Sequence, residues 1–484
     1  MRRRWTVSFA VTLSIALLTV CGVGLRAAEA PALVPLPEHV TFIRAGRLEQ
    51  VLAGDDEATV LVDPAQLPAE DPGFAPPLSI VAYWWAPEGT HVLVGVESEA
   101  TGARRLFICD GGGDNPTAVT VASGLFTGGG GSTWEDPAVV WSPDGRSIAL
   151  TVFEGGSAFG DIYVVGLDGS GDIVGSGIEP AWSPDSTKIV YARAVPEVVS
   201  LADARPYVSV GTLGGGSVDL GIGRAPVFSP DGEDVLYRTW TEAGGEGGDP
   251  EQLAIAPANG GAERRLTAYG PMDDMGGPSA IYGHRFSPDG ERVYYLLGRR
   301  SDSRYVYEVA ADGSFAEPVV VSGLASEFTL SLDGSRLVYA NGQVYEASHQ
   351  TKQQVIVRDL ASCAEWQLTP TELADYTCSN LSISHQDRYV AFDAAIVPAG
   401  TLPESAATRE VWVGTLDGSH AWLCASDAWA SASQPLYGGS TAADDDAGDL
   451  GPMDDDYDPS RTGFFQAIAD AIASFFEWLA GLFD

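Results

Sequence analysis

The stretch FSPDGERVYY, residues 286–295, recurs along this chain of 484 residues. Strict copies are WSPDGRSIAL at Trp141, WSPDSTKIVY at Trp182 and FSPDGEDVLY at Phe228. Looser copies, WAPEGTHVLV, LSLDGSRLVY and ISHQDRYVAF, begin at Trp85, Leu330 and Ile383. Seven copies of one decapeptide indicate a repeated architectural unit, because a single active site would need its motif only once.

The residue types of the decapeptide fit a turn between two strands. Proline presets φ at the first turn position, the aspartate side chain can accept hydrogen bonds from the following backbone amides, and glycine tolerates positive φ. The segment after the turn, ERVYY in one copy, alternates as a half-buried strand does. We therefore expect a strand–turn–strand corner in every copy, with the preceding Trp or Phe packed between neighbouring units.

The copies are spaced by 56, 41, 46, 58, 44 and 53 residues, the range of four-stranded propeller blades with loop insertions. A second strand pair follows each copy, such as IYVVGLDGSGDIV after the copy at Trp141. The sequence therefore predicts an all-β fold: a seven-bladed β-propeller of four-stranded antiparallel blades over residues 79–425, with six or eight blades as alternatives.

The aromatic-Ser-Pro-Asp-Gly motif resembles the TolB-like β-propeller repeat, a relative of the WD repeat. The resemblance covers about residues 79–425 and implies a ring of blades on the far side of the inner membrane. The chain departs from the TolB pattern because it has no room before residue 79 for an N-terminal α/β domain, and because it has seven repeats where TolB has six blades. The resemblance therefore implies a fold and transfers no specific partner.

The composition is rich in turn residues and strongly acidic. Fifty-seven Gly and thirty Pro fit many short strands joined by tight turns. The net charge of -39 arises from 66 acidic and 27 basic residues. Such a surface repels phosphate backbones and anionic headgroups but attracts cations and basic partners. Nucleic acid is therefore excluded as an expected partner.

The first thirty residues have the pattern of an export signal. Arg2, Arg3 and Arg4 precede an apolar run and the small residues AAEA. The run of about twenty residues is also long enough to remain as an uncleaved membrane anchor. A lipidated Cys21 is disfavoured by Val20 before it. We expect an exported protein, periplasmic or secreted, in which residues 31–78 either close the ring with a strand hairpin or begin an eighth, partial blade.

The cysteines after Cys21 are even in number. In an oxidising compartment Cys109, Cys363, Cys378 and Cys424 permit two disulfides. Cys363 and Cys378 are the candidate pair, because only fifteen residues separate them. No CxxC or histidine cluster indicates a zinc site. No cofactor is expected, although the acidic GPMDD turns at 270 and 451 could bind Ca²⁺ weakly.

The composition changes after Cys424. Residues 426–460 are small, polar and acidic, as in a solvated linker. Residues 461–484 predict an amphipathic helix that could fold back on the propeller, dock another protein or lie on a membrane surface. Its apolar positions are Phe465, Ile468, Ile472, Phe475, Phe476, Leu479 and Phe483.

Candidate ligand-binding residues lie just before the turns, where the innermost strand of each blade should face the central channel. They are Glu179, Arg224, His284, Arg285, Glu327 and Asn380. Converging polar groups from five blades could bind a ligand, or could simply be solvated channel walls.

Catalysis is not expected from these residues. The sequence has no GxSxG motif, and one channel histidine, His284, is too few for the metal-binding site of the pectin-fragment lyases that resemble this propeller. We predict a protein-binding or scaffold module with a partner in the cell envelope or outside the cell. Its contact with membrane would involve only the N-terminal segment or the C-terminal helix. The alternative is a carbohydrate-active lyase or hydrolase with a site at the channel mouth, where Glu179 and Glu327 could act as carboxylates.

Overall fold

The computed structural model describes residues 39–429, except 53–56, 69–72, 88, 122–138, 154–158, 194–204, 241–249, 270–279, 299–303, 315, 321–323, 345–350, 374–375, 385–386 and 397–407. All of these residues belong to the first of the chain's two units, Met1–Ala442. The predicted export signal, the C-terminal helix, residues 430–460 of the acidic linker and both GPMDD turns lie outside the described residues. The first four residues of the predicted linker, 426–429, are described, and Ser426, Ala428 and Trp429 lie in strands.

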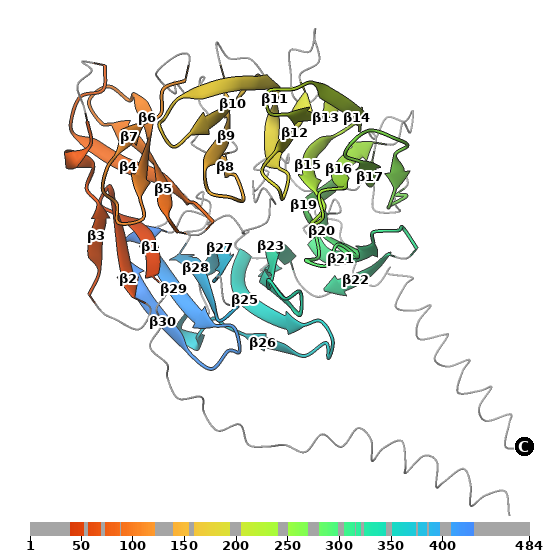
Figure 1. The fold of residues 1–484 in the computed structure, drawn as a ribbon. Helices are drawn as coiled ribbons and strands as arrows, with labels where there is room; N and C mark the ends of the chain where they lie inside the picture. The colour runs from red at the N-terminus through yellow and green to blue at the C-terminus, as the bar shows by residue number, and fades with distance from the viewer. Residues whose placement is uncertain are drawn as a thin grey trace, which may run out of the picture. The chain divides into compact units, whose positions relative to one another are not determined.

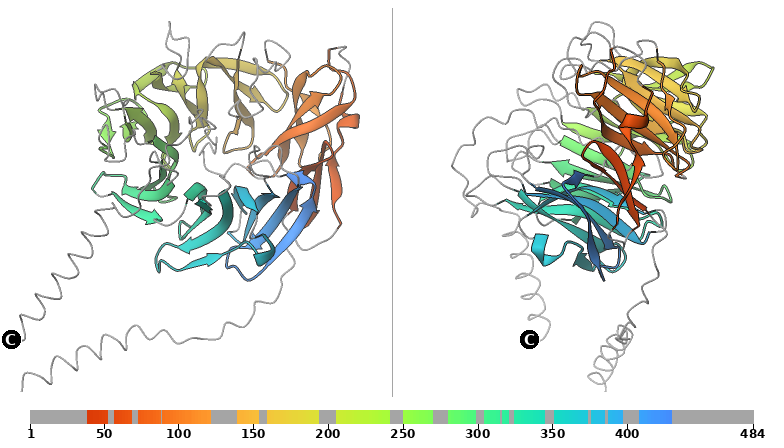
Figure 2. Two further views of the ribbon diagram at one scale, coloured as in Figure 1. Left: turned by 180° about the vertical axis from the view of Figure 1, so that it is seen from behind. Right: turned by 90° about the vertical axis from the view of Figure 1, so that its left-hand side faces the viewer.

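The described residues form antiparallel sheets that follow one another around a ring (Figures 1 and 2). Blade 1 contains β4 (Leu78–Trp85), β5 (His91–Ser98), β6 (Arg104–Asp110) and β7 (Thr117–Ala118). The next sheet has seven strands: β8 (Val140–Trp141), β9 (Ser147–Val152), β10 (Gly160–Gly166), β11 (Gly171–Trp182), β12 (Lys188–Arg193), β13 (Tyr207–Thr212) and β14 (Ser217–Ile222). The long β11 ends blade 2 and begins blade 3.

The remaining blades each have four strands. Blade 4 contains β15 (Arg224–Phe228), β16 (Asp234–Trp240), β17 (Glu251–Pro257) and β18 (Arg264–Arg265). Blade 5 contains β19 (Ala280–Phe286), β20 (Arg292–Gly298), β21 (Arg304–Ala310) and β22 (Ala316–Val320). Blade 6 contains β23 (Leu324–Leu330), β24 (Arg336–Val344), β25 (Thr351–Asp359) and β26 (Glu365–Gln367). Blade 7 contains β27 (Thr377–Ile383), β28 (Tyr389–Ile396), β29 (Thr408–Thr415) and β30 (Ala421–Ser426).

A further four-stranded sheet, blade 8, joins the two ends of the described chain. Its order is β3-β2-β1-β31, with β1 (His39–Arg44), β2 (Arg47–Leu52), β3 (Thr59–Val62) and β31 (Ala428–Trp429). β1 pairs with β31 through Ile43 opposite Trp429 and Arg44 opposite Ala428. The predicted count of seven blades is therefore not confirmed: the described strands supply eight four-stranded units, and β1–β3 and β31 extend beyond residues 79–425. Two short 3-10 helices, η1 (Pro64–Gln66) and η2 (Thr371–Leu373), lie between strands.

The apolar core lies between neighbouring blades. One cluster joins Ala181 and Val190 of blade 3 to Phe228 and Val235 of blade 4. The aromatic residue of the motif contributes a polar contact as well: the Trp182 indole nitrogen donates to the Val140 carbonyl at 2.9 Å, and that of Trp141 donates to the Trp84 carbonyl at 3.0 Å. Each of these tryptophans therefore binds the inner strand of the preceding blade, as the motif predicts.

The turn of the motif has the expected chemistry. In the copy at residues 286–295, the Ser287 hydroxyl donates to Asp289 at 2.5 Å and accepts from the Arg292 amide at 3.0 Å. Asp289 also accepts from the Glu291 amide at 3.0 Å, and Gly290 adopts φ 74°. The same Ser-to-Asp bond recurs at 2.6 Å between Ser183 and Asp185. These polar contacts close the corner without any external partner.

The predicted disulfide between Cys363 and Cys378 is wrong. All four cysteines of the described residues are free thiols. Cys363 is exposed in the turn between β25 and β26, whereas Cys378 is buried in β27, the first strand of the next blade. Burial raises the pKa of the Cys378 thiol to about 12, with further contributions from Asp393 and Glu327. In the described part of the chain, no helix is both long and apolar enough to cross a membrane.

Candidate functional site at the inner strands

The candidate residues lie on the first strands of blades 3 to 7, where the strand pairing is interrupted. In Figure 1 first strands such as β23 and β27 lie toward the centre of the ring, and fourth strands such as β26 lie at its periphery. Register shifts occur just before the motif in β11, β15, β19, β23 and β27. A bulge of this kind leaves a residue unpaired and redirects its side chain and amide.

Backbone conformation marks these bulges. Three residues before the first residue of the motif, φ is positive at Glu179 (56°), Ala225 (49°), Gly283 (53°) and Asn380 (57°). Glycine and asparagine tolerate this region, whereas Glu and Ala do so at a cost. At two of these residues the backbone amide bonds with the preceding blade: the Ala225 amide donates to Glu179, and that of Asn380 to Glu327.

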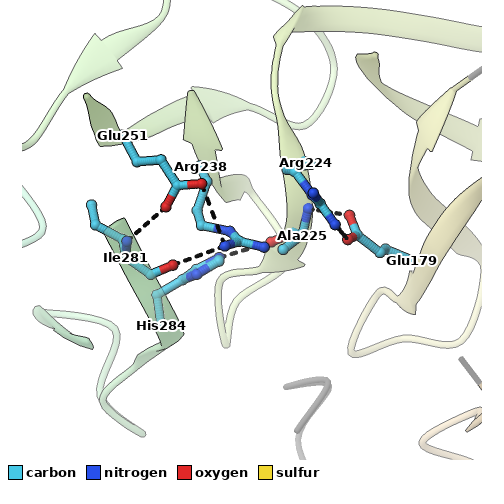
Figure 3. A network of polar contacts seen from close by, with 7 residues as sticks. All are labelled: Glu179, Arg224, Ala225, Arg238, Glu251, Ile281 and His284. Atoms are coloured by element: carbon cyan, nitrogen blue, oxygen red, sulfur yellow. Dashed lines mark hydrogen bonds and ion pairs between the residues drawn. The ribbon is translucent and has the colours of Figure 1, made fainter. Parts of the chain in front are cut away.

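Glu179 binds the bulge of the following blade (Figure 3). Its Oε1 accepts from Arg224 at 2.9 Å (Nη2) and 3.2 Å (Nε), and its Oε2 accepts from the Ala225 amide at 2.5 Å. The side chains of Arg224 and Glu179 are 19% and 17% exposed. Charged hydrogen bonds at this depth are stronger than exposed ion pairs, so the contact joins blade 3 to blade 4.

Blade 4 is joined to blade 5 by contacts to the Ala225 bulge and to Ile281 of β19. His284 is buried, and its Nε2 lies 2.7 Å from the Ala225 carbonyl (Figure 3). The buried Arg238 donates to the Ile281 carbonyl at 2.8 Å, while Glu251 accepts from the Ile281 amide at 2.6 Å. Arg238 and Glu251 themselves lie 3.6 Å apart. Both backbone groups of one β19 residue are thus bound by side chains of blade 4.

Arg285 joins blade 5 to blade 6. Its Nη1 donates to the Thr329 hydroxyl at 3.1 Å, and its guanidinium carbon lies 4.9 Å from the centre of the Phe328 ring. Its Nε is buried without a hydrogen-bond partner among the described residues. Burial lowers the pKa of Arg285 to about 10, and the nearby Glu327 opposes this effect. The side chain therefore remains a cation.

Glu327 joins blade 6 to blade 7. Its Oε1 accepts from the Leu381 amide at 3.2 Å. Burial raises the pKa of Glu327 to about 7; the negative charge of Asp393 acts in the same direction, while the Leu381 amide and Arg285 oppose it. Asn380 donates to the buried Asp393 at 2.7 Å. A carboxyl group with this pKa can hold or release a proton near neutral pH.

The structure does not bring the six candidates together at one point. It places them in a series of contacts between successive blades, from blade 3 to blade 7. Sequence reasoning missed Arg238, Glu251, Thr329 and Asp393, which complete these contacts. The sequence offered one signal of these contacts, which is the position three residues before each motif. In successive blades that position holds Glu179, Ala225, Gly283, Glu327 and Asn380. Within the described ranges, no three His, Cys, Asp or Glu side chains are grouped as ligands for a metal ion.

Comparisons with known proteins give only distant likenesses. No family model and no curated protein matches the chain. A solved structure from a study of two prolyl endopeptidases is 15% identical, over 71% of this chain and 49% of that chain, with a TM-score of 0.49. An oligogalacturonate lyase in complex with manganese is 14% identical, over 79% and 96% of the two chains, with a TM-score of 0.47. TolB from Acinetobacter baumannii is 15% identical, over 66% and 74%, with a TM-score of 0.34. This chain thus spans about half the length of the endopeptidase chain, and at these values the likenesses bear on neither activity nor partner.

Proposed function

We propose that this protein is an extracytoplasmic β-propeller that binds another protein or acts as a scaffold, without catalysis of its own. The observation that carries the proposal is that the polar side chains of the inner strands bind neighbouring blades. Glu179, Arg224, His284, Arg285 and Glu327 each contact a neighbouring blade. Groups that hold a ring together in this way leave recognition to the outer surfaces of the blades.

The location outside the cytoplasm rests on the first thirty residues, whose three arginines and apolar run are typical of an export signal. The net charge of -39 favours basic partners. A protein partner in the envelope or outside the cell is consistent with both features.

Capture from envelope extract tests this function, with the full mature chain compared with a chain ending at Asp458. A partner captured by both forms indicates recognition by the blades. A partner captured only by the longer form assigns docking to residues 459–484. No partner with either form would contradict the proposal.

A carbohydrate-active lyase or hydrolase is the second candidate, favoured by one observation. Glu327 has a pKa of about 7 beside Asp393, and a general base works best when its pKa lies near the working pH. The test is ultraviolet detection of unsaturated products from uronate oligosaccharides. This function predicts activity that Glu327→Gln lowers by about a hundredfold or more. Glu372→Gln, at an exposed position of η2, controls for loss of charge and should leave the activity unchanged.

A further inference from the structure

The outermost hairpin of blade 3, β13–β14, exposes an unusual number of apolar side chains. Seven large hydrophobic residues are exposed among the described residues, and four lie in this hairpin. They are Tyr207 (38%), Leu213 (38%), Val218 (41%) and Ile222 (39%). Tyr207 and Ile222 are directly opposite each other in the strand pairing. Val218 is opposite Val210, three residues from Tyr207, with a register shift between them, so Val218 and Ile222 are exposed on opposite faces of the hairpin.

The free edge of this hairpin is suited to pairing with another strand. β14 is the last strand of the seven-stranded sheet and pairs with β13 alone. It has six residues, as does β30 at the equivalent edge of blade 7, whereas β7 and β18, at the edges of blades 1 and 4, have two. It contains no Lys, Arg or Pro, the residues that commonly protect an edge from further pairing. Its backbone donors and acceptors on that side are available to an added strand.

Charge distinguishes between possible occupants. Asp219 is the sole charged residue of the hairpin, and its carboxylate already accepts from Arg193 at 2.9 and 3.1 Å and from Ser209. The edge itself is therefore close to neutral within a chain of net charge -39. A second copy would bring an equal negative charge to the interface, whereas a cationic segment would be attracted to it.

We propose that β14 is the docking site for an extended, basic polypeptide segment with alternating apolar residues, which adds to the sheet as a further strand. Backbone hydrogen bonds to β14 supply affinity, and the apolar residues of the segment contact either Ile222 or Val218, which are on opposite faces of the hairpin. This inference rests on the proposed protein-binding function and names the surface that performs it.

The test uses a labelled synthetic peptide of about eight residues, alternating Lys and Val, with binding followed by fluorescence anisotropy. A second peptide of the same sequence carries N-methyl groups on alternate amides, which preserves its charge but removes hydrogen-bond donors. The protein variants are Val218→Lys/Ile222→Lys and the uncharged Val218→Ser/Ile222→Ser. The control, Val60→Lys/Leu423→Lys, adds the same charge at equally exposed positions of β3 and β30.

We expect the unmodified peptide to bind the wild-type protein and to lose about tenfold in affinity when methylated or when tested on Val218→Lys/Ile222→Lys, with a smaller loss for the serine variant. The control should bind as the wild type does. Equal loss in the control, equal binding of both peptides, or no binding would overturn the proposal. Self-association that Val218→Lys/Ile222→Lys abolishes in sedimentation velocity would overturn it too, by identifying a second copy as the occupant.

Failure of this inference can be separated from failure of the proposed function. If Val218→Lys/Ile222→Lys still captures the envelope partner at the wild-type level, the binding function stands and β14 is excluded as its site. If no partner is captured by the wild-type protein, the function itself fails.

Discussion

Glu179 and Glu327 occupy the same position of the repeat, yet their surroundings differ. Glu179 faces the guanidinium of Arg224 at 2.9 Å, whereas Glu327 is buried near the carboxylate of Asp393 and has a pKa of about 7. One repeat position thus yields an ion pair in one blade and a carboxyl group that titrates near neutrality in another. The neighbouring blade, rather than the motif, decides which.

Glu327 should make stability depend on pH. Its pKa is raised in the folded state above the usual value of 4.5, so the folded form holds the proton more tightly. Stability is therefore lost as pH rises from about 4.5 to about 7. Glu327→Gln keeps an acceptor for the Leu381 amide and removes the titration. Denaturant unfolding measures the difference in unfolding free energy between the variant and the wild type at two pH values. We expect this difference to favour the variant more at about pH 8 than at about pH 5. A difference independent of pH would contradict this assignment.

At the residue scale, the sequence predicted the turns correctly and the disulfide incorrectly. The roles of Ser287, Asp289 and Gly290 are local, because their partners lie within five residues. The Ser287 hydroxyl bond is the main cause of the lowered pKa of Asp289. The separation of Cys363 from Cys378 depends instead on where an outer turn lies relative to the next inner strand, which spacing along the chain does not reveal.

At the scale of elements, a buried and a half-buried glutamine, Gln252 and Gln354, hold outer segments to the third strands. Gln252 of β17 accepts from the Thr267 hydroxyl at 3.0 Å and the Tyr269 amide at 2.8 Å, and donates to the Tyr269 carbonyl at 2.9 Å. Blade 6 repeats the arrangement, with Gln354 accepting from the Thr369 hydroxyl at 2.7 Å. The repeated Gln and Leu-Thr positions are visible in the sequence, but their pairing required the strand register.

Replacement of Gln252 by Leu should destabilise the protein. The change leaves the amide and carbonyl of Tyr269 without their partner, which costs about 2 kcal/mol in the free energy of unfolding. Gln50→Leu, at a half-buried position of β2, is the matched control and should change stability by less than about 0.5 kcal/mol. Denaturant titration followed by tryptophan fluorescence measures both. Similar effects of the two substitutions would refute a specific role for Gln252.

The inner-strand contacts were only partly predictable, because they also depend on backbone geometry. The sequence identified polar residues before the turns, since their positions follow from the motif. It gave no indication that bulges place Glu179 and Ala225 at positive φ, or that the Ala225 amide and carbonyl bind two different blades. Backbone amides and carbonyls make much of this contact, and every residue type except proline has both groups, so the sequence does not reveal which of them bind.

At the scale of the whole ring, closure depends on the short β31. Ala428 is fully buried in a cluster with Phe42, Val51, Val411 and Ala425, which come from blades 7 and 8. Because β1 and β31 share a sheet, two strand edges that would otherwise be free to pair with other chains are removed. The sequence indicated a closing hairpin in residues 31–78 but not the two-residue strand it pairs with.

Ala428→Asp should weaken closure. A carboxylate in this apolar cluster would cost about 3 kcal/mol, seen as a lower midpoint of thermal unfolding and as faster proteolysis of the native protein. Ala361→Asp places the same charge on an exposed turn and should behave as the wild type does. If the two variants unfold alike, the β1–β31 pairing is not needed for the ring.

The central claim is that polar inner-strand residues hold neighbouring blades together, and a double-mutant cycle on Glu179 and Arg224 tests it most directly. Unfolding free energies are measured for Glu179→Ala, Arg224→Ala, the double variant and the wild type. The same cycle is run on the more exposed pair Arg47 and Asp63, 3.8 Å apart. We predict a coupling energy of about 1–2 kcal/mol between Glu179 and Arg224 and less than about 0.5 kcal/mol between Arg47 and Asp63. A coupling energy near zero between Glu179 and Arg224 would contradict the claim and return both side chains to the list of ligand-binding candidates.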